Sequence, residues 1–220
     1  MNEIAYREMA GFINHCAQEA GHGRSKLDSL ALDVPGMTSL LIKHFINNLC
    51  SQGASYLEIG SLMGATAVAA SYGNSGPFYA IDNYCQWPIF TEETCKLIQD
   101  WNRTHHLIGR NIRSLWDENV HGCGCNATLI EADCMKWDIP PDLQVDIFYY
   151  DEGHSTAETK LALQKYIPAL KPGILLVDDY NDAEVQAGVA QAEIPTVYTF
   201  LHHKEWNGFA TFIINGDYYD

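Results

Sequence analysis

Short apolar runs that end near acidic residues alternate along this chain with segments whose apolar positions follow helical spacing. Runs of this length, bounded by turn residues, are typical of buried strands in a parallel sheet. The predicted strands are 55–59, 77–82, 127–131, 145–151, 174–180, 196–201 and 209–214. The predicted helices are 2–21, 40–50, 65–70, 92–107, 156–167 and 183–192. This alternation predicts an α/β fold.

The last two predicted strands are connected differently from the others. Only residues 202–208 lie between them, whereas the earlier strands are separated by longer segments. A parallel pair needs a crossover of a dozen or more residues, usually through a helix. We therefore expect strands 196–201 and 209–214 to form an antiparallel pair.

The first predicted strand gives way to a helix through a turn with two glycines. Gly60 follows the strand, and Gly64 precedes the Ala-rich segment 65–70. Gly60 can adopt backbone angles that a side chain forbids, and Gly64 lets the backbone approach a ligand closely. The free amides at the start of the helix face the same turn, which suits a small polar ligand. Such glycines also occur for steric reasons alone, so this interpretation needs support from a second site.

A second strand that ends in an acid supplies that support. Asp82 closes the run 77–82, one strand after Glu58. In a doubly wound sheet, an acid at this tip is placed to accept hydrogen bonds from ribose hydroxyls. The spacing from Glu58 to Gly64 is ExGxxxG and not the GxGxxG that cradles a pyrophosphate. A nucleoside-bearing cofactor is therefore expected, and a dinucleotide is the less natural ligand.

The acid, glycine and second glycine at Glu58, Gly60 and Gly64 resemble the first motif of the class I S-adenosylmethionine-dependent methyltransferases. Within that superfamily, the closer resemblance is to small-molecule O-methyltransferases of the catechol and macrocin types. It implies a Rossmann-like, seven-stranded, mostly parallel sheet with helices on both faces and an antiparallel last strand pair. It also implies S-adenosylmethionine as cofactor. The resemblance covers roughly residues 35–215, so we expect a methyltransferase domain at 35–220 and an N-terminal helical cap at 1–34.

The predicted cofactor-binding residues share a position at or just beyond the carboxyl end of a parallel strand, where open α/β sheets bind ligands. They are Glu58, Gly60, Ser61, Gly64, Asp82, Asp133, Cys134 and Asp151. The resemblance assigns Asp133 to the adenine side. The family often has Ser or Ala where this chain has Cys134, which leaves the role of that side chain open. For Glu58, a helix-capping or surface acid is the alternative.

Acids at the ends of the fourth and fifth predicted strands suggest a magnesium site formed by Asp151, Asp178 and Asp179. Close carboxylates repel unless a cation or protons intervene, and oxygen ligands suit a hard divalent ion. The catechol-type enzymes bind their metal with an acid at the fourth tip and an acid followed by Asn or Asp at the fifth. Their general base follows the first acid by three residues, where this chain has His154 in place of Lys. Solvated strand-end acids and a helix-capping His are the alternative.

Three other stretches have both a structural and a functional interpretation. The segment Met37–Ser39 is either punctuation before a helix cap or an entrance loop over the cofactor, which the resemblance favours. Trp87, just beyond Asp82, is either a core residue or a contact for substrate or adenine. The segment His121–Cys125 contains a CxC pair with one His but lacks the second pair of a structural zinc site. A glycine-rich turn is the preferred interpretation there.

Composition narrows the classes of partner. The chain has 220 residues, of which 47% are hydrophobic, and it fits one domain better than two. A net charge of -15 disfavours nucleic acids and anionic membrane surfaces. The first residues lack a signal-peptide pattern, and no apolar run is long enough to span a bilayer, so we expect a cytoplasmic protein. Seven scattered cysteines suit reduced thiols.

Together these features predict an enzyme that transfers the methyl group of S-adenosylmethionine to a hydroxyl of a small molecule with the help of a divalent cation such as Mg²⁺. A metal-independent methyltransferase, a nucleotide enzyme of another class such as a dehydrogenase, and a non-catalytic cofactor-binding protein are the alternatives. The identity of the acceptor stays open. So does the oligomeric state, a homo-oligomer included.

Overall fold

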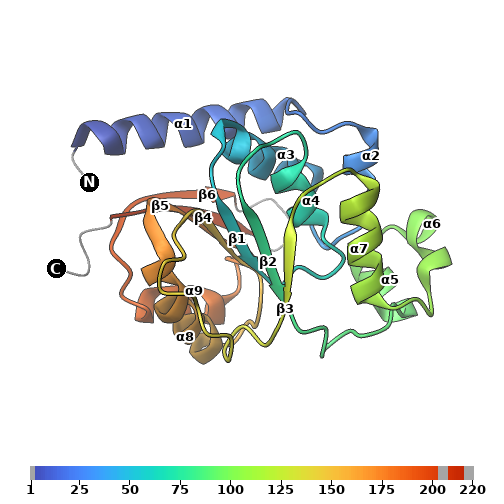
Figure 1. The fold of residues 1–220 in the computed structure, drawn as a ribbon. Coiled ribbons are helices and arrows are strands. Elements are labelled where there is room, and N and C mark those ends of the chain that lie inside the picture. Colours follow the sequence, from blue (N-terminus) through green and yellow to red (C-terminus); the bar gives the residue numbers. More distant parts are fainter. Residues whose placement is uncertain (1–2, 203–207, 216–220) are drawn as a thin grey trace.

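A single mixed sheet organises the computed structural model, which describes residues 3–202 and 208–215 (Figure 1). Its strands are β1 Tyr56–Ile59, β2 Phe78–Asp82, β3 Thr128–Glu131, β4 Val145–Tyr150, β5 Leu170–Val177, β6 Thr196–His202 and β7 Phe209–Ile214. The strand order is β3-β2-β1-β4-β5-β7-β6. Strands β1 to β5 pair in parallel, and β7 runs antiparallel to both β5 and β6. The predicted fold class and the antiparallel last pair are confirmed.

Helices cover both faces of this sheet. The α-helices are α1 Glu3–Gly21, α2 Ser29–Leu32, α3 Leu40–Leu49, α4 Ala65–Ser71, α5 Glu92–Ile98, α6 Trp101–Thr104, α7 Ile112–Gly122, α8 Thr156–Tyr166 and α9 Ala183–Gln191. Short 3₁₀ turns are η1 Cys50–Gln52, η2 His105–Leu107 and η3 Ile167–Ala169. None of the described helices is long and apolar enough to cross a membrane.

The side chains of β4 show why helices pack on both faces of the sheet. Phe148 and Tyr150 pack into the core cluster that includes α8 and α9, whereas Ile147 and Tyr149 pack into the cluster that includes α1 and α3. Successive side chains of a strand point to opposite faces, so an apolar run buries both. Figure 1 shows α1 and α3 on one side of the sheet and α8 and α9 on the other.

The tips of β1 and β4 approach each other so closely that only a glycine fits between them. Gly60, which follows β1, has a φ of +85°, and a Cβ at this position would lie 1.7 Å from the carbonyl oxygen of Asp151. The amide of Asp151 donates to the carbonyl of Ile59 at 3.1 Å. Because β1 lies between β2 and β4, the chain leaves the sheet in opposite directions here, and such a switch point opens a crevice.

The fifth strand begins and ends earlier than predicted. The sequence pattern placed it at 174–180, but the observed strand is Leu170–Val177. Gly173 explains the difference, since a Cβ there would lie 2.4 Å from the carbonyl oxygen of Asp146 on β4. The glycine lets the two strands lie close together where their pairing changes register, between Val145–Leu170 and Ile147–Ile174. Asp178 and Asp179 consequently lie just beyond the strand.

The region between β2 and β3 differs most from the prediction. The helix predicted at 92–107 is divided into α5, α6 and η2, because Gln99 ends α5 in a left-handed conformation with a φ of +57°. Helix α7 was not predicted. Asn111 caps it by accepting a hydrogen bond from the amide of Ser114 at 2.9 Å, and its buried face includes Trp116.

Two predictions concern residues outside the described ranges. The first predicted helix starts at residue 2, and the tight link between the last two strands includes 203–207. The division at residue 34 stays a prediction, although Ile13 and Cys16 of α1 pack in one cluster with α3 and the sheet.

Replacement of Gly60 by alanine is expected to destabilise the fold strongly. The new methyl group would clash with the Asp151 carbonyl in a left-handed backbone conformation, which together cost about 3 kcal/mol or more. Gly11 in α1 is the matched control, because a Cβ there meets nothing within 4 Å. Gly11→Ala should raise the free energy of unfolding by roughly 0.5–1 kcal/mol. Urea denaturation measures both, and a Gly60→Ala protein as stable as wild type would contradict the close approach.

Candidate functional site

A cavity of about 370 Å³ lies at the carboxyl ends of β1, β2, β4 and β5, and we call it the large cavity. Five segments supply most of its walls: 36–38 before α3, 60–62 after β1, 82–87 after β2, 151–154 after β4, and 178–179 after β5. These are the loops that a switch point brings together at one edge of the sheet. The location of the predicted site at this edge follows from the strand order.

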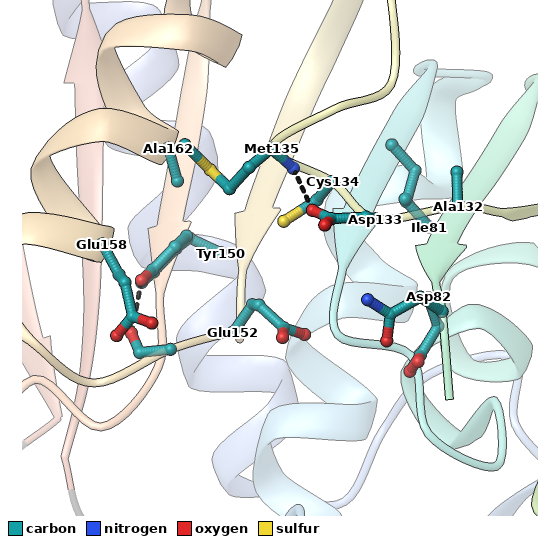
Figure 2. A pocket seen from close by; sticks show the side chains of 12 residues that line it. Ile81, Asp82, Ala132, Asp133, Cys134, Met135, Tyr150, Glu152, Glu158 and Ala162 are labelled. Carbon is teal, nitrogen blue, oxygen red and sulfur yellow. Dashed lines mark hydrogen bonds between the residues drawn. The ribbon is translucent and has the colours of Figure 1, made fainter. Parts of the chain in front are cut away.

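A second cavity of about 250 Å³, the small cavity, lies beside it (Figure 2). Its walls include Asp133, Cys134 and Met135 after β3. Asp82 and Glu152 line both cavities, so the two share a wall between the ends of β2 and β4. The arrangement suits one elongated ligand that spans both cavities.

Asp82 ties the turn after β1 to the end of β2. Its carboxylate accepts hydrogen bonds from the amide of Leu62 at 2.8 Å and from the amide of Tyr84 at 2.7 Å. Both donors have positive φ, +47° for Leu62 and +54° for Tyr84, so the carboxylate stabilises two strained turns. Burial raises the pKa of Asp82. A carboxylate has about four acceptor positions, so room remains for ligand hydroxyls.

Glu58 lies behind the glycine turn and lines neither cavity. It is fully buried, and its carboxylate accepts hydrogen bonds from the hydroxyl of Tyr56 at 2.7 Å and from the hydroxyl of Ser61. The indole nitrogen of Trp116 donates to the same Ser61 hydroxyl at 2.8 Å. A Cβ on Gly64 would lie 2.9 Å from the Trp116 ring, so this glycine makes room for the indole. Burial raises the pKa of Glu58 from 4.5 to about 7.

The predicted acids after β4 and β5 lie together, but each has a protein partner. The buried hydroxyl of Tyr149 donates to Asp178 at 2.8 Å and lies 3.3 Å from a carboxylate oxygen of Asp151. The other oxygen of Asp178 accepts the amide of Asp179 at 3.0 Å. The Nε2 atom of His154 lies 2.7 Å from Asp179 Oδ2. Burial, then neighbouring negative charge, raises the pKa of Asp151, and burial raises that of Asp178.

This arrangement does not provide a ready metal site. Among residues 3–202 and 208–215, no group of three or more His, Cys, Asp or Glu side chains is arranged to hold a metal ion. Asp178 uses both oxygens within the protein, and Asp179 is paired with His154. The three acids of the predicted magnesium site therefore lie close together, but each already contacts a side chain of the protein.

Asp133 and Cys134 both line the small cavity, as expected for one side of a ligand site. Asp133 accepts hydrogen bonds from the amide of Met135 at 2.9 Å and from Lys136 Nζ at 2.7 Å, and the Lys136 contact lowers its pKa. Burial raises the pKa of Cys134 to about 12, so its thiol stays neutral. That Asp133 and Cys134 bind a cofactor remains a prediction.

The segment before α3 combines both interpretations that the sequence left open. Ser39 caps α3 by accepting the amide of Ile42 at 3.2 Å, while Met37 and Thr38 line the large cavity. Trp87 also lines this cavity. His121 and the following Gly-Cys pairs form the turn that ends α7, and all seven cysteines are free thiols.

A buried lysine binds the backbone just before the segment 36–38, which lines the large cavity. Lys43 is only 4% exposed, and its ammonium group donates to the carbonyl of Leu32 at 2.9 Å and to that of Val34 at 2.5 Å. A Cβ on Gly36 would lie 2.4 Å from the Cβ of Ala65 at the start of α4. The segment is thus held against the helix that follows the glycine turn.

Three site residues were not identified from the sequence. Glu152 lines both cavities, and burial, followed by the charge of Asp82, raises its pKa to about 7. It directly follows a predicted strand tip, which was a usable signal. Tyr149 is hidden in an apolar run that reads as core. Trp116 belongs to the unpredicted α7, whose buried Ile112, Leu115 and Trp116 have helical spacing.

No protein-family model and no curated protein matches the sequence. Several solved structures are similar to this chain. An S-adenosylhomocysteine-bound methyltransferase, PaMTH1 from Podospora anserina, has a TM-score of 0.54 and 12% identity, with 98% of this chain and 97% of that one covered. An rRNA methylase from Streptococcus thermophilus has a TM-score of 0.52 and 14% identity, with 78% and 93% covered.

TrmN from Thermus thermophilus has a TM-score of 0.52 and 16% identity over 84% of this chain. This chain spans about half of TrmN, 52% of its length. At such identities the likeness shows the fold alone. The Rossmann-like methyltransferase fold that the sequence predicted is thereby confirmed.

The raised pKa of Glu58 makes a prediction about stability and pH. The folded state holds a proton that the unfolded chain releases near pH 4.5, so this group stabilises the fold at low pH and loses that effect as pH rises through about 7. Glu58→Gln has no such titration. Its free energy of unfolding relative to wild type should rise by about 3 kcal/mol between pH 4.5 and pH 8.

Urea denaturation across that pH range measures the difference. Glu118→Gln, at an exposed acid on α7, controls for the loss of one negative charge. A difference between Glu58→Gln and wild type that does not change with pH would show that Glu58 is ionised in the folded protein.

Proposed function

We propose that this protein is an S-adenosylmethionine-dependent methyltransferase that acts on a hydroxyl group of a small molecule. The observation that carries the proposal is the shared lining of the large cavity. The turn after Gly60, the carboxylate of Asp82 and the paired His154 and Asp179 all open onto it. A cofactor-binding edge and a candidate base thus face one space.

The residues around both cavities fit the proposed cofactor. Asp82 has acceptor positions for ribose hydroxyls, and Asp133 and Cys134 border the small cavity on the adenine side. The large cavity is also lined by Gly60, Ser61, Leu62 and Thr66, which border the space for the methionine part. When bound, S-adenosylmethionine supplies an electrophilic methyl group. PaMTH1, with the same fold, is described as bound to S-adenosylhomocysteine, which supports this choice.

His154 has the chemistry of a general base. Its neutral imidazole can accept the proton of an acceptor hydroxyl, which makes the oxygen a better nucleophile. Asp179 lies 2.7 Å from Nε2, orients the ring and stabilises the imidazolium that forms. Asp178 accepts hydrogen bonds from the Tyr149 hydroxyl and from the Asp179 amide. These contacts hold Asp179 in place, and Asp179 in turn positions the His154 ring.

The charge of the lining favours a small acceptor over a nucleic acid. The acids that line the large cavity are Asp82, Asp151, Glu152, Glu158, Asp178 and Asp179. No lysine or arginine lines it among the described residues. With a net charge of -15, the chain would repel phosphates. The rRNA methylase with this fold shows that the fold by itself does not choose between the two classes.

A metal-assisted reaction is the second candidate. The acids Asp151, Asp178 and Asp179 lie at neighbouring strand ends, as in the catechol-type enzymes that the sequence resembles. A divalent ion there would compete with Tyr149 for Asp178 and with His154 for Asp179. Turnover with EDTA, and then with added Mg²⁺, separates the candidates: EDTA-resistant turnover supports the metal-independent reaction.

The first test of the proposed function is ligand binding. Calorimetry should detect S-adenosylmethionine and S-adenosylhomocysteine but not NAD. Incubation with S-adenosylmethionine labelled in its methyl group, together with sets of phenolic and sugar acceptors, should then yield a labelled product. Binding without transfer to any acceptor would favour a non-catalytic cofactor-binding protein, and binding of NAD alone would contradict the proposal.

The His154–Asp179 pair makes a prediction about the pH dependence of turnover. The hydrogen bond to Asp179 raises the pKa of His154 above 6.5, so the neutral base forms, and turnover rises, only above that pH. Asp179→Asn removes the cause of the shift and should move the acidic limb to lower pH. His154→Ala should lower kcat by about a hundred-fold or more and remove the limb.

The affinity for S-adenosylhomocysteine serves as the control, because both variants should keep it. A His154→Ala enzyme with an unchanged pH profile would show that His154 is not the general base. The proposed cofactor would not be affected by that result.

A further inference from the structure

Glu152 occupies the wall that the two cavities share. It follows Asp151 at the end of β4 and lines both the small and the large cavity. In Figure 2, its side chain extends between Glu158 on one side and Asp82 on the other. Since Asp82 also lines both cavities, the two carboxylates border the same junction.

The backbone on either side of Glu152 is fixed. The carbonyl of Asp151 lies against Gly60, and the amide of Asp151 donates to β1. After Glu152 the chain turns at Gly153, which has a φ of +44°, and the hydroxyl of Tyr150 donates to the Gly153 carbonyl. This short loop therefore presents the Glu152 side chain from a rigid base.

Among the described residues, the carboxylate of Glu152 has no hydrogen-bond donor or cation as partner, unlike the other acids around the small cavity. The carboxylate of Asp82 accepts hydrogen bonds from two backbone amides. That of Asp133 accepts one from Lys136, and that of Glu158 accepts one from the Ser155 hydroxyl. The oxygens of Glu152 are not among the buried unpartnered atoms, so water can reach them and ligand hydroxyls can take the place of that water. The negative charges of Asp82 and Glu158 act on Glu152 as well, so the site favours a ligand that brings donors.

We infer that Glu152 is a second ribose-binding carboxylate, which accepts one hydroxyl of the cofactor's vicinal diol while Asp82 accepts the other. This inference rests on the proposed function. Ribose connects the adenine to the part that carries the sulfonium, so it belongs at the junction of the two cavities. A diol offers two donors, and the junction offers two carboxylates from neighbouring loops.

Binding of adenosine, 2′-deoxyadenosine and 3′-deoxyadenosine, measured by calorimetry, tests the inference. Glu152→Ala should weaken adenosine binding by about ten-fold, since a hydrogen bond to a charged acceptor is lost. For the deoxyadenosine that lacks the partner hydroxyl of Glu152, the same substitution should have little effect. Glu152→Gln keeps an acceptor oxygen and should weaken adenosine less than Glu152→Ala.

Glu118→Gln is the control, because it removes a negative charge at an exposed acid on α7, outside both cavities. It should leave the preference for adenosine over the deoxyadenosines as in wild type. An equal loss for adenosine and both deoxyadenosines in Glu152→Ala would overturn the inference. So would a loss confined to S-adenosylmethionine and absent for S-adenosylhomocysteine, because Glu152 would then act on the sulfonium charge.

The failures of the two proposals are distinguishable. Wild type that binds neither adenosine nor S-adenosylhomocysteine would overturn the proposed function and this inference with it. Wild type that binds both, with a Glu152→Ala variant of unchanged affinity, would overturn the role of Glu152 alone.

Discussion

The approach of two strand ends at Gly60 and Asp151 is the constraint on which the site depends. A carbonyl oxygen occupies the space where any other residue would have its Cβ. This contact fixes the turn after β1 against the loop after β4. The first loop lines the large cavity with Gly60, Ser61 and Leu62, and the second lines it with Glu152 and His154. Together with the parallel pairing of β1 and β4, it sets the spacing of the two halves of the proposed site.

Behind the cavity walls, buried hydroxyl groups hold the acids in place. Tyr56 and Ser61 donate to Glu58, and Tyr149 donates to Asp178. A hydroxyl satisfies a buried carboxylate without adding a positive charge, so Glu58 and Asp178 keep the raised pKa values that burial gives them. The site therefore favours ligands that bring donors or positive charge, which agrees with a sulfonium cofactor and a ribose diol.

The sequence predicted the sheet well, because parallel strands buried on both faces are continuous apolar runs. It also placed Asp82, His154 and Asp179 at one edge, since strand ends converge there. It missed α7, where the glycine-rich end and the scattered aromatics hid a helical spacing. The hydrogen-bond partners of the acids could not be predicted from the sequence. Tyr149 has the pattern of a core residue, but in the structure its hydroxyl lies between Asp151 and Asp178. Metal geometry depends on such partners and could not be read from the acids alone.

The position of β7 has a consequence for the synthesis of the protein. This strand follows the other described strands in sequence, yet it lies inside the sheet and pairs with both β5 and β6. Until residues 209–214 have left the ribosome, β5 has an unpaired edge and β6 has no neighbour in the sheet. Open strand edges attract other chains. The nascent protein thus carries an exposed strand edge until residues 209–214 have been synthesised, and the pairing of β7 then covers that edge.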